Sequence, residues 1–415
     1  MFMPNTNGKH LHTKADPTPH IETVRRLNED VVLPLKRMFV GKDEIIDLMG
    51  IALVARENLF LLGPPGTAKS AIVRSMANRL DGQVFDYLLT KFTEPNELFG
   101  PFDIRRLRDG ELVTNTEGML PEADFVFLDE LLNANSSILN SLLMALNERV
   151  FRRGRETRSL PALFFVGASN RLPEDEALGA LFDRFLLRVR CDNVVDEHLP
   201  AVLQAGWAMQ TQAVGNYPTA SAVGSGDYAM ISVERLRALQ FAVDQVDLGQ
   251  IATTYVEVLR KMRRAGVAIS DRRAVKLQRP IAASALICGR TIANTTDLWI
   301  LKHIWDIQEQ QEILAAIVES TLEQSTERER SGSHPQSQRN APPNAEEISM
   351  ALDGLLETLT NKSNDENAII AKVVARDKLS ALTTRSQWIV DEPQRTFLQE
   401  KCNSVWTVLQ SVEGC

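Results

Sequence analysis

Cysteines are few in this sequence, and long apolar runs are absent. The four cysteines, Cys191, Cys288, Cys402 and Cys415, are far apart and form no C-x-x-C pair. Their spacing signals neither a zinc site nor a disulfide framework, and it predicts reduced thiols in the cytoplasm. No apolar run approaches the roughly 18 residues of a membrane span, and residues 1–20 lack the apolar segment of a secretory leader. We therefore expect neither secretion nor a membrane helix.

Positive charge and aromatic residues are also scarce. Lysine and arginine number 46 against 54 acidic residues, which gives a net charge of −8, and aromatics make up only 6% of the chain. This balance argues against whole-surface attraction to nucleic acid or to anionic membranes, although a local basic site could persist in an acidic protein. The 44% hydrophobic content is ordinary for a globular protein, and 415 residues suffice for two or three domains.

Apolar strand-like runs alternate with helical patterns in the first half of the chain. The runs lie at 58–62, 84–89, 124–130 and 162–170. Continuous apolar strands separated by helices predict an α/β domain with a parallel, doubly wound sheet. Beyond Asp192 we expect the strands to stop, and the pattern predicts an all-α domain with helices near 195–210, 232–244, 249–265, 271–290 and 296–320.

These patterns divide the chain into five regions. Residues 323–347 are polar, charged and proline-containing, which predicts a flexible linker. The predicted order is a disordered tail at 1–20, an α/β nucleotide-binding domain at 21–192, an all-α lid domain at 193–322, the linker at 323–347, and a C-terminal helical region at 348–415.

A phosphate-binding loop follows the first strand-like run. The segment GPPGTAKS matches G-x-x-x-x-G-K-[ST] and stands between a strand and a helix start, where this motif functions. Backbone N–H groups of such a loop and the helix N-terminus bind phosphate oxygens. Lys69 is expected to contact the β and γ phosphates of ATP, and Ser70 to ligate Mg²⁺. The loop residues are Gly63, Pro64, Pro65, Gly66, Thr67, Ala68, Lys69 and Ser70.

Polar side chains end two further strand-like runs. Asp129 and Glu130 follow FVFL, and Asn170 ends FFVGASN. The carboxyl ends of parallel strands share one edge of the sheet, where open α/β sheets bind their ligands. Asp129 is expected to hold Mg²⁺, Glu130 to act as the general base for the attacking water, and Asn170 to reach the same water or phosphate. The alternatives are that the two acids only cap the next helix and that Asn170 only forms a turn.

Arg184 stands in EALGALFDRFLLRVR, between an apolar turn and an apolar strand. A guanidinium in such surroundings is costly without a partner. Either it pairs inside the fold, with Asp183 or Glu176, or it reaches out of it.

Taken together in this order, several motifs resemble the MoxR family of AAA+ ATPases. They are the segment from FVGKDE to GPPGTAKS, LPEADFVFLDELLNANSSILNSLLMALNERVF, FFVGASN and LFDRFLLRV, within about residues 21–310. SDRR at 270–273 and FGPFDI most resemble the RavA branch. The chain departs from the commoner MoxR pattern in one place, because Asn133 and Asn135 stand where an arginine usually follows the Walker B acids.

The resemblance implies roles for the candidate residues. Gly63–Ser70 would be Walker A, Asp129 and Glu130 Walker B, and Asn170 sensor 1. Val40 and Gly41 would line the adenine pocket. Arg272 would be sensor 2, with Arg273 as the alternative register. Arg184 would be an arginine finger that contacts the ATP of a neighbouring subunit, which implies a homo-oligomer, most commonly a hexameric ring.

Two insertions interrupt the α/β pattern, at 99–120 and 147–161. The second is expected to form a hairpin carrying Arg149, Arg152, Arg153, Arg155 and Arg158. We hypothesise that these arginines engage an acidic segment of a protein client, with a solvated hairpin of satisfied charges as the alternative. The near absence of aromatics among them weakens the case for nucleic acid.

The resemblance implies an ATP-driven, chaperone-like remodelling protein whose partner carries a von Willebrand factor A domain. The alternatives are a nucleotide-gated scaffold with slow hydrolysis, a nucleic-acid translocase and, weakest, a small-molecule kinase.

Overall fold

The structure is a computed structural model that describes residues 18–108, 112–153, 156–173, 176–215, 230–338, 345–361 and 391–413, with isolated positions between 375 and 389. Residues 1–17 of the predicted tail lie outside this range. Its last residues belong to helix α1 (Thr18–Arg26), so the predicted boundary at residue 20 is wrong. The pattern misled because Pro19, which suggested a loop, is compatible with the first turn of a helix.

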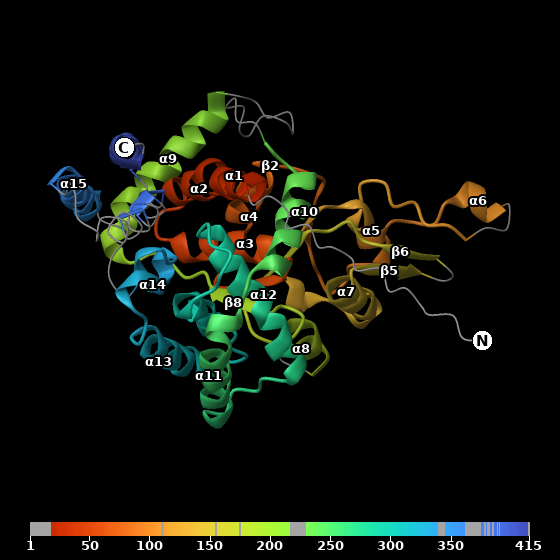
Figure 1. Cartoon of the computed structure of the whole chain (residues 1–415). Helices are drawn as coiled ribbons and strands as arrows, with labels where there is room; N and C mark the ends of the chain where they lie inside the picture. The colour runs from red at the N-terminus through yellow and green to blue at the C-terminus, as the bar shows by residue number, and fades with distance from the viewer. Residues whose placement is uncertain are drawn as a thin grey trace, which may run out of the picture.

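Five parallel strands form the central sheet, in the spatial order β3-β4-β7-β1-β8. Strands β1 and β7 are buried along their whole length, so helices and loops cover both faces of the sheet at its centre. The predicted parallel α/β sheet is confirmed, with Figure 1 showing it inside the helices. The strands are β1 (Leu59–Leu62), β3 (Val84–Leu88), β4 (Phe125–Asp129), β7 (Phe164–Ser169) and β8 (Leu187–Arg190).

Helices precede and cover this sheet. Helix α1 continues through a π-helical turn (Leu27–Val32) into α2 (Leu33–Met38), where Pro34 occupies the tolerated first turn. The buried α3 (Asp43–Ala55) leads into β1. The other helices of the domain are α4 (Lys69–Ala77), α5 (Pro95–Phe99), α6 (Ile104–Arg108), α7 (Ser136–Glu148), α8 (Glu176–Phe182) and α9 (Leu199–Gly215).

The strands do not stop at Asp192, contrary to the prediction. A two-residue strand, β9 (Ile231–Ser232), pairs in parallel with β2 (Leu80–Asp81), and it is too short to leave an apolar run in the sequence. Helix α10 (Val233–Ala242) then packs against α1 and α3. These contacts attach residues 231–242 to the α/β domain.

The all-α domain consists of α11 (Ala252–Arg264), α12 (Asp271–Ile287), a 3₁₀ segment (Thr295–His303) and α13 (Gln310–Leu322). The single helix predicted at 296–320 is therefore two elements. The break has a cause in the side chains: the carboxylate of Asp306 accepts hydrogen bonds from Arg188 and Arg273, and its backbone N–H donates to Gln310. These contacts hold the chain in a turn between the two elements.

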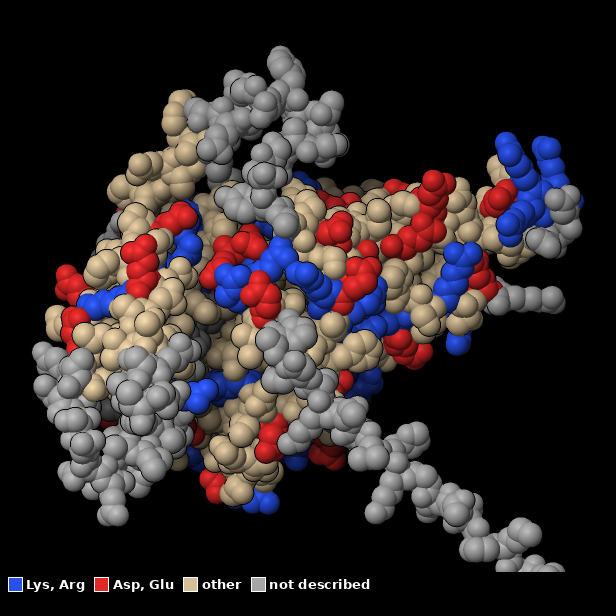
Figure 2. Space-filling model, turned by 45° about the horizontal axis from the view of Figure 1, so that its top comes forward, with Lys and Arg blue, Asp and Glu red and all other residues tan. Residues whose placement is uncertain are grey.

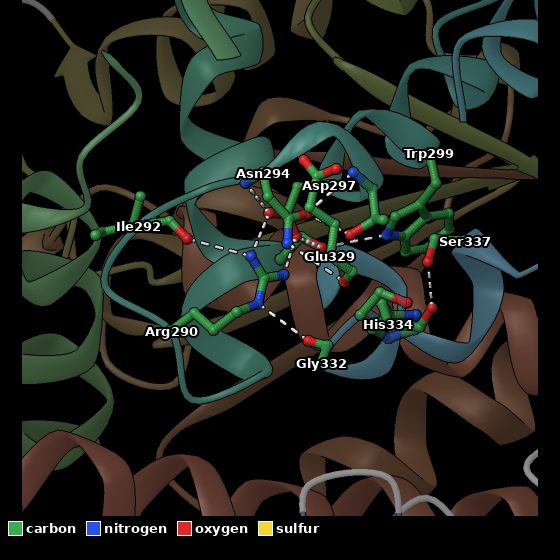
Figure 3. Close-up of polar contacts among 12 residues, drawn as sticks. Arg290, Ile292, Asn294, Asp297, Trp299, Glu329, Gly332, His334 and Ser337 are labelled. Atoms are coloured by element: carbon green, nitrogen blue, oxygen red, sulfur yellow. Dashed lines mark hydrogen bonds and ion pairs between the residues drawn. The ribbon is translucent and has the colours of Figure 1, made fainter. Parts of the chain in front are cut away.

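The first part of the predicted flexible linker is folded, so the linker prediction is wrong over 323–338. This strap, residues 323–338, contains α14 (Glu327–Ser331) and a 3₁₀ turn (Pro335–Ser337). Arg290 of the lid holds the backbone of the strap, because its Nε donates a hydrogen bond to the Gly332 oxygen at 3.0 Å. The His334 ring stacks on Trp299 with centroids 4.8 Å apart (Figure 3). Residues 339–344 lie outside the described residues.

The strap also contacts the α/β domain. Gln336 donates a 3.0 Å hydrogen bond to the buried Asp47 of α3, which pairs with Lys36 of α2 at 2.7 Å. The strap is ordered although its sequence is polar, because its few buried side chains contact residues of both the lid and the α/β domain. Hydrophobic periodicity could not reveal this, since the contacts are polar.

The C-terminal region is helical, as predicted. Helices α15 (Ala345–Asn361) and α17 (Glu392–Glu413) pack against each other around Ile348, Leu352, Leu398 and Val405. Figure 1 shows this pair on the side of the molecule opposite to α6 and to the hairpin of β5 (Val150–Arg153) and β6 (Glu156–Ser159).

Candidate active site

The loop Gly63–Ser70 joins β1 to α4 and is shaped by close approaches and left-handed backbone. A Cβ on Gly63 would stand 2.1 Å from the Cys191 carbonyl oxygen, so only glycine fits there. Gly66 has φ +85° with no neighbour within 4 Å of a Cβ, and Ala68 has φ +69°. A left-handed alanine costs on the order of 1 kcal/mol, and such strain is typical of functional loops.

Lys69 is the buried cation of the loop. Its Nζ donates to the Gly63 oxygen at 2.6 Å and to the Pro64 oxygen at 2.9 Å. Two of its three N–H donors are thereby used, which leaves one for a ligand in the loop. Thr67 Oγ1 donates to the Pro64 oxygen at 2.9 Å and closes the turn. The loop is therefore arranged to receive an anion with its ammonium held in place.

Ser70 and Asp129 meet as the sequence predicts. The Ser70 hydroxyl donates to Asp129 Oδ2 at 2.6 Å. A hydroxyl and a carboxylate side by side are the hard oxygen donors that suit Mg²⁺. The residues present therefore fit that ion.

Glu130 lies beside Asp129 in a left-handed conformation, with φ +49° and ψ +41°. Partial burial and the neighbouring Asp129 carboxylate raise the pKa of Glu130 above its usual range. The raised pKa moves Glu130 towards the range of a general base that can accept a proton near neutral pH.

Asn170 is exposed at the end of β7, and its backbone N–H lowers the pKa of Glu130, which places the two residues close together. Arg171 lies close enough to lower the pKa of Glu130, and its Nη2 donates to Asn133 Oδ1 at 3.2 Å. The sequence reasoning missed Arg171. Its position one residue after the candidate Asn170, at the same sheet edge, was the available signal.

Val40 and Gly41 lie beside the segment that follows β8. A Cβ on Gly41 would stand 3.0 Å from Val194, and its φ of +74° also requires glycine. Cys191, the first residue after β8, connects this segment to the phosphate-binding loop, because its Sγ donates a hydrogen bond to the Thr67 oxygen at 3.2 Å. The two predicted adenine-pocket residues are thus in the neighbourhood of the loop.

Arg184 lies at the opposite end of the sheet. Its carbonyl oxygen accepts a 2.7 Å hydrogen bond from Asn58, the residue that precedes β1, whereas the phosphate-binding loop follows β1. Four strand residues at about 3.3 Å each separate the two, or roughly 13 Å. Its Nε is buried and finds no hydrogen-bond partner among the described residues. The internal pairing with Asp183 or Glu176 is not seen there.

Arg272 joins Arg184 rather than the phosphate-binding loop. Both line one cavity of about 500 Å³, here called the finger cavity, together with Asn147, Lys276 and Asp306. The exposed Arg272 guanidinium donates to Asn147 Oδ1 at the end of α7. Arg273, the alternative register, is held by Asp306 at 3.0 Å and by the Ile304 oxygen. Of the two, Arg272 is therefore the one presented to a ligand.

The candidate residues thus form two half-sites. Lys69, Ser70, Asp129, Glu130 and Asn170 meet at the carboxyl edge of the sheet. Arg184 and Arg272 meet at the amino edge. The phosphate-binding loop follows β1, two acids follow β4, Asn170 follows β7 between them, and an all-α lid completes the chain. This arrangement defines a P-loop nucleotide-binding protein of the AAA+ class.

Comparison with known proteins agrees with this class. Residues 25–224 match the family described as the MoxR domain in the MoxR-vWA-beta-propeller ternary systems, and residues 250–318 match the AAA lid domain. Two uncharacterized proteins of Methanocaldococcus jannaschii, MJ0079 and MJ0812, are 36% and 34% identical over 66% and 65% of this chain and 68% and 69% of their own lengths.

Chaperone MoxR1 of Mycobacterium tuberculosis is 28% identical over 39% of this chain and 43% of its own length. The crystal structure of a candidate ATPase from Cytophaga hutchinsonii has the same fold, with a TM-score of 0.56 at 18% identity over 75% of this chain and 96% of that one. The chain belongs to the MoxR family of AAA+ ATPases. No helix in the described ranges is long and apolar enough to cross a membrane.

Proposed function

We propose that this protein hydrolyses ATP at the interfaces of a ring of its own copies, most simply a hexamer, and uses the energy to remodel or activate a partner protein. One observation carries the proposal. The phosphate-binding loop lies at one end of the strands, and Arg184, whose Nε has no hydrogen-bond partner in the described part of the chain, lies at the other. One chain therefore supplies only half of each active site. Closed ring symmetry would bring the amino edge of one copy against the carboxyl edge of the next.

Each residue has a task in this scheme. Lys69 and the loop N–H groups bind the phosphates, while Ser70 and Asp129 hold Mg²⁺, which would neutralise phosphate charge. Glu130, with its raised pKa, accepts the proton of the attacking water, and Asn170 reaches the same water or the phosphate. Val40 and Gly41 receive the adenine.

Arg184 of the neighbouring copy stabilises the charge that develops on the γ-phosphate, and Arg272 acts beside it. Such arginines contribute roughly 10³ to 10⁵ in rate in related NTPases. Arg272 would then also serve the nucleotide of the neighbour, because it shares the finger cavity with Arg184 and not the phosphate-binding loop of its own chain.

A partner with a von Willebrand factor A domain is supported by the family description, which names a MoxR-vWA-beta-propeller system. The chaperone name of MoxR1 supports the remodelling role. Membership of the RavA branch remains a prediction from SDRR and FGPFDI. The described cysteines, Cys191, Cys288 and Cys402, are buried free thiols, which supports the predicted cytoplasmic setting.

The client-binding hypothesis needs a correction in its residues. Arg149 is internal, with its guanidinium 4.3 Å above the Phe165 ring and hydrogen-bonded to Asn58. Arg153 donates to the Gly100 oxygen and lies over Phe102. Both arginines therefore have structural roles. The hairpin of β5 (Val150–Arg153) and β6 (Glu156–Ser159) packs against the 99–120 insertion, where the Phe151 ring stacks on Phe99 with centroids 5.5 Å apart.

Arg158 also serves this packing, since it pairs with Glu156 at 2.6 Å and donates to Thr116. Arg155 lies outside the described residues. Besides Arg158, the exposed basic side chains described in the projection are Arg105, Arg106 and Arg108 of α6 and Arg152 of β5. Figure 2 shows a blue tip, formed by α6 with its three arginines, at the end that carries α6 in Figure 1. We infer that this tip engages an acidic segment of the client.

The proposal is tested by removing the finger while the loop stays intact. In Arg184→Ala we expect the ATPase rate to fall by at least about 10³-fold, with ATP affinity within about twofold of wild type, since Arg184 acts on the neighbour's nucleotide. Arg260→Ala, an exposed arginine on α11, is the matched control. Full ATPase activity of Arg184→Ala at protein concentrations where the chain is monomeric would contradict the proposal.

A further inference from the structure

A second cavity, distinct from the finger cavity, lies between the α/β domain and the lid. It measures about 420 Å³ and is here called the cationic cavity. Its walls are the turn before β1, the end of α7, α10 and α12. Five basic residues line it against three acidic ones: Arg56, Arg149, Arg237, Lys276 and Arg279 against Glu57, Glu148 and Asp244. No candidate active-site residue lines it.

Arg149, which lines this cavity, carries an unsatisfied donor. Its Nη2 donates to Asn58 Oδ1 at 2.7 Å, but its Nη1 is buried and has no hydrogen-bond partner within the described chain. Leaving such a charged donor unpaired costs more free energy than leaving a buried neutral group unpaired. Burial lowers the pKa of Arg149 to about 9, so it remains charged at neutral pH.

Arg56 stands at the exposed rim of the same cavity. Its guanidinium makes no hydrogen bond or ion pair with any described residue, and it occupies a left-handed position with φ +56°. Partial burial and the nearby cations Arg237 and Arg279 lower the pKa of Arg56. Repulsion among these guanidinium groups is relieved when an anion enters.

The remaining basic residues divide into two kinds. Arg237 and Arg279 are occupied: Arg237 donates to Asp124 and to the Pro161 oxygen, and Arg279 donates to Asp244 and to two carbonyl oxygens. Lys276 of α12 is only loosely engaged, because its nearest carboxylate, Glu57, is 3.8 Å away. Arg56 and Arg149 from the α/β domain and Lys276 from the lid therefore retain N–H donors that an anion can use.

We propose that the cationic cavity binds the phosphate group of a small molecule, which Arg56, Arg149 and Lys276 hold between the α/β domain and the lid. Guanidinium groups bind phosphate oxygens in a bidentate geometry. The Glu57 carboxylate neutralises only one of the three cations, so a phosphate dianion would balance the other two. The volume exceeds that of phosphate alone. Phe241 at the rim is 71% exposed and offers a ring face to a base.

The position of the cavity gives the bound anion a consequence. Asn147 and Lys276 line both the cationic cavity and the finger cavity, and Asn147 accepts the hydrogen bond from Arg272. An anion that draws Lys276 towards Arg149 fixes α12 against α7, and with it the place of Arg272. The site is thus suited to adjust the neighbour-facing arginines.

The test is isothermal titration of the full chain, saturated with ADP to fill the phosphate-binding loop, with inorganic phosphate, pyrophosphate and AMP in separate arms. We expect one saturable site for pyrophosphate per chain. Arg56→Asn, which suits the left-handed backbone, and Lys276→Gln should each weaken it at least tenfold. Tighter binding of AMP than of inorganic phosphate would indicate a nucleotide as the source, and the reverse a free phosphate.

Arg260→Gln on α11 lies outside the cavity lining and should bind pyrophosphate as wild type does. Arg149→Lys tests the central residue, and the two rim variants keep the test valid if that variant does not fold. Three results would overturn the proposal. The first is the absence of saturable pyrophosphate binding, and the second is wild-type affinity for pyrophosphate in both Arg56→Asn and Lys276→Gln. The third is a pyrophosphate signal that comes only from the dissociation of oligomers. The last would mean that a neighbouring copy fills the cavity. None of these outcomes depends on whether the chain hydrolyses ATP.

Discussion

Replacing Arg290 by alanine should release the strap from the lid and destabilise the protein. Arg290 forms a two-pronged pair with Asp297, at 2.6 and 2.8 Å, and its Nε holds the Gly332 oxygen (Figure 3). The Asp297 side chain is fully buried. The variant would leave this carboxylate charged and without its cation.

The magnitude follows from what remains around Asp297. Breaking a buried pair from one side typically costs about 3–5 kcal/mol. Here Ser284 Oγ at 2.9 Å and the Asn294 N–H at 2.9 Å continue to donate to the carboxylate, so we expect the lower end, about 3 kcal/mol. For units of this size the loss corresponds to a fall in Tm of roughly 6–12 °C.

The assay is thermal unfolding followed by calorimetry, with limited proteolysis to locate the loosened segment at 323–338. Arg290→Ala with Asp297→Asn should recover part of the loss, because the unpaired charge is then gone. Arg260→Ala is the control for removal of an exposed arginine. A Tm for Arg290→Ala within about 2 °C of wild type would refute the reasoning, as would a double variant that is no more stable than the single one.

Three further predictions concern the base, the strap and the projection. Glu130→Gln should keep ATP binding and lose at least about 100-fold in hydrolysis, because the water loses its proton acceptor; unchanged turnover in single-cycle kinetics would exclude that role. Burial lowers the pKa of His334 to about 4 from the usual 6.5, so the folded state prefers its neutral form. Stability is then full above pH 6.5 and is lost as the pH falls towards 4, by up to about 3 kcal/mol. His334→Phe should show a flatter Tm between pH 7 and 5 than wild type, and a parallel decline would argue against this account. Changing Arg105, Arg106 and Arg108 to glutamine should reduce client-stimulated ATPase severalfold and leave basal ATPase unchanged, as measured with and without client; equal stimulation would remove the tip from client binding.

Much of the fold was predictable because its signals are local. Central strands buried on both faces appear as continuous apolar runs, as at 59–62 and 164–169, and the phosphate-binding loop is a contiguous motif. The meeting of Ser70 and Asp129 also followed from the shared carboxyl edge of parallel strands. Residues that depend only on strand order and direction were thus foreseeable.

The strap and Arg149 were not predictable, since their structure depends on partners distant in sequence. His334 is buried only because Trp299 and Asp47 lie on either side of it, and nothing near residue 334 announces either one. Arg149 looked like one of several hairpin arginines, yet a left-handed turn after α7 directs it onto Phe165. The composition of a segment predicts only its average exposure to solvent. A single polar side chain that is buried by a distant partner cannot be predicted in this way.

The most direct test of the shared active site is to mix two variants that are each inactive. Lys69→Ala lacks a working loop but retains Arg184, and Arg184→Ala lacks the finger but retains the loop. If each site is built from two chains, equimolar mixing should restore ATPase activity to about a quarter of wild type, because one interface in four then combines both intact halves. A mixture as inactive as its components, although co-assembly is verified, would contradict the account.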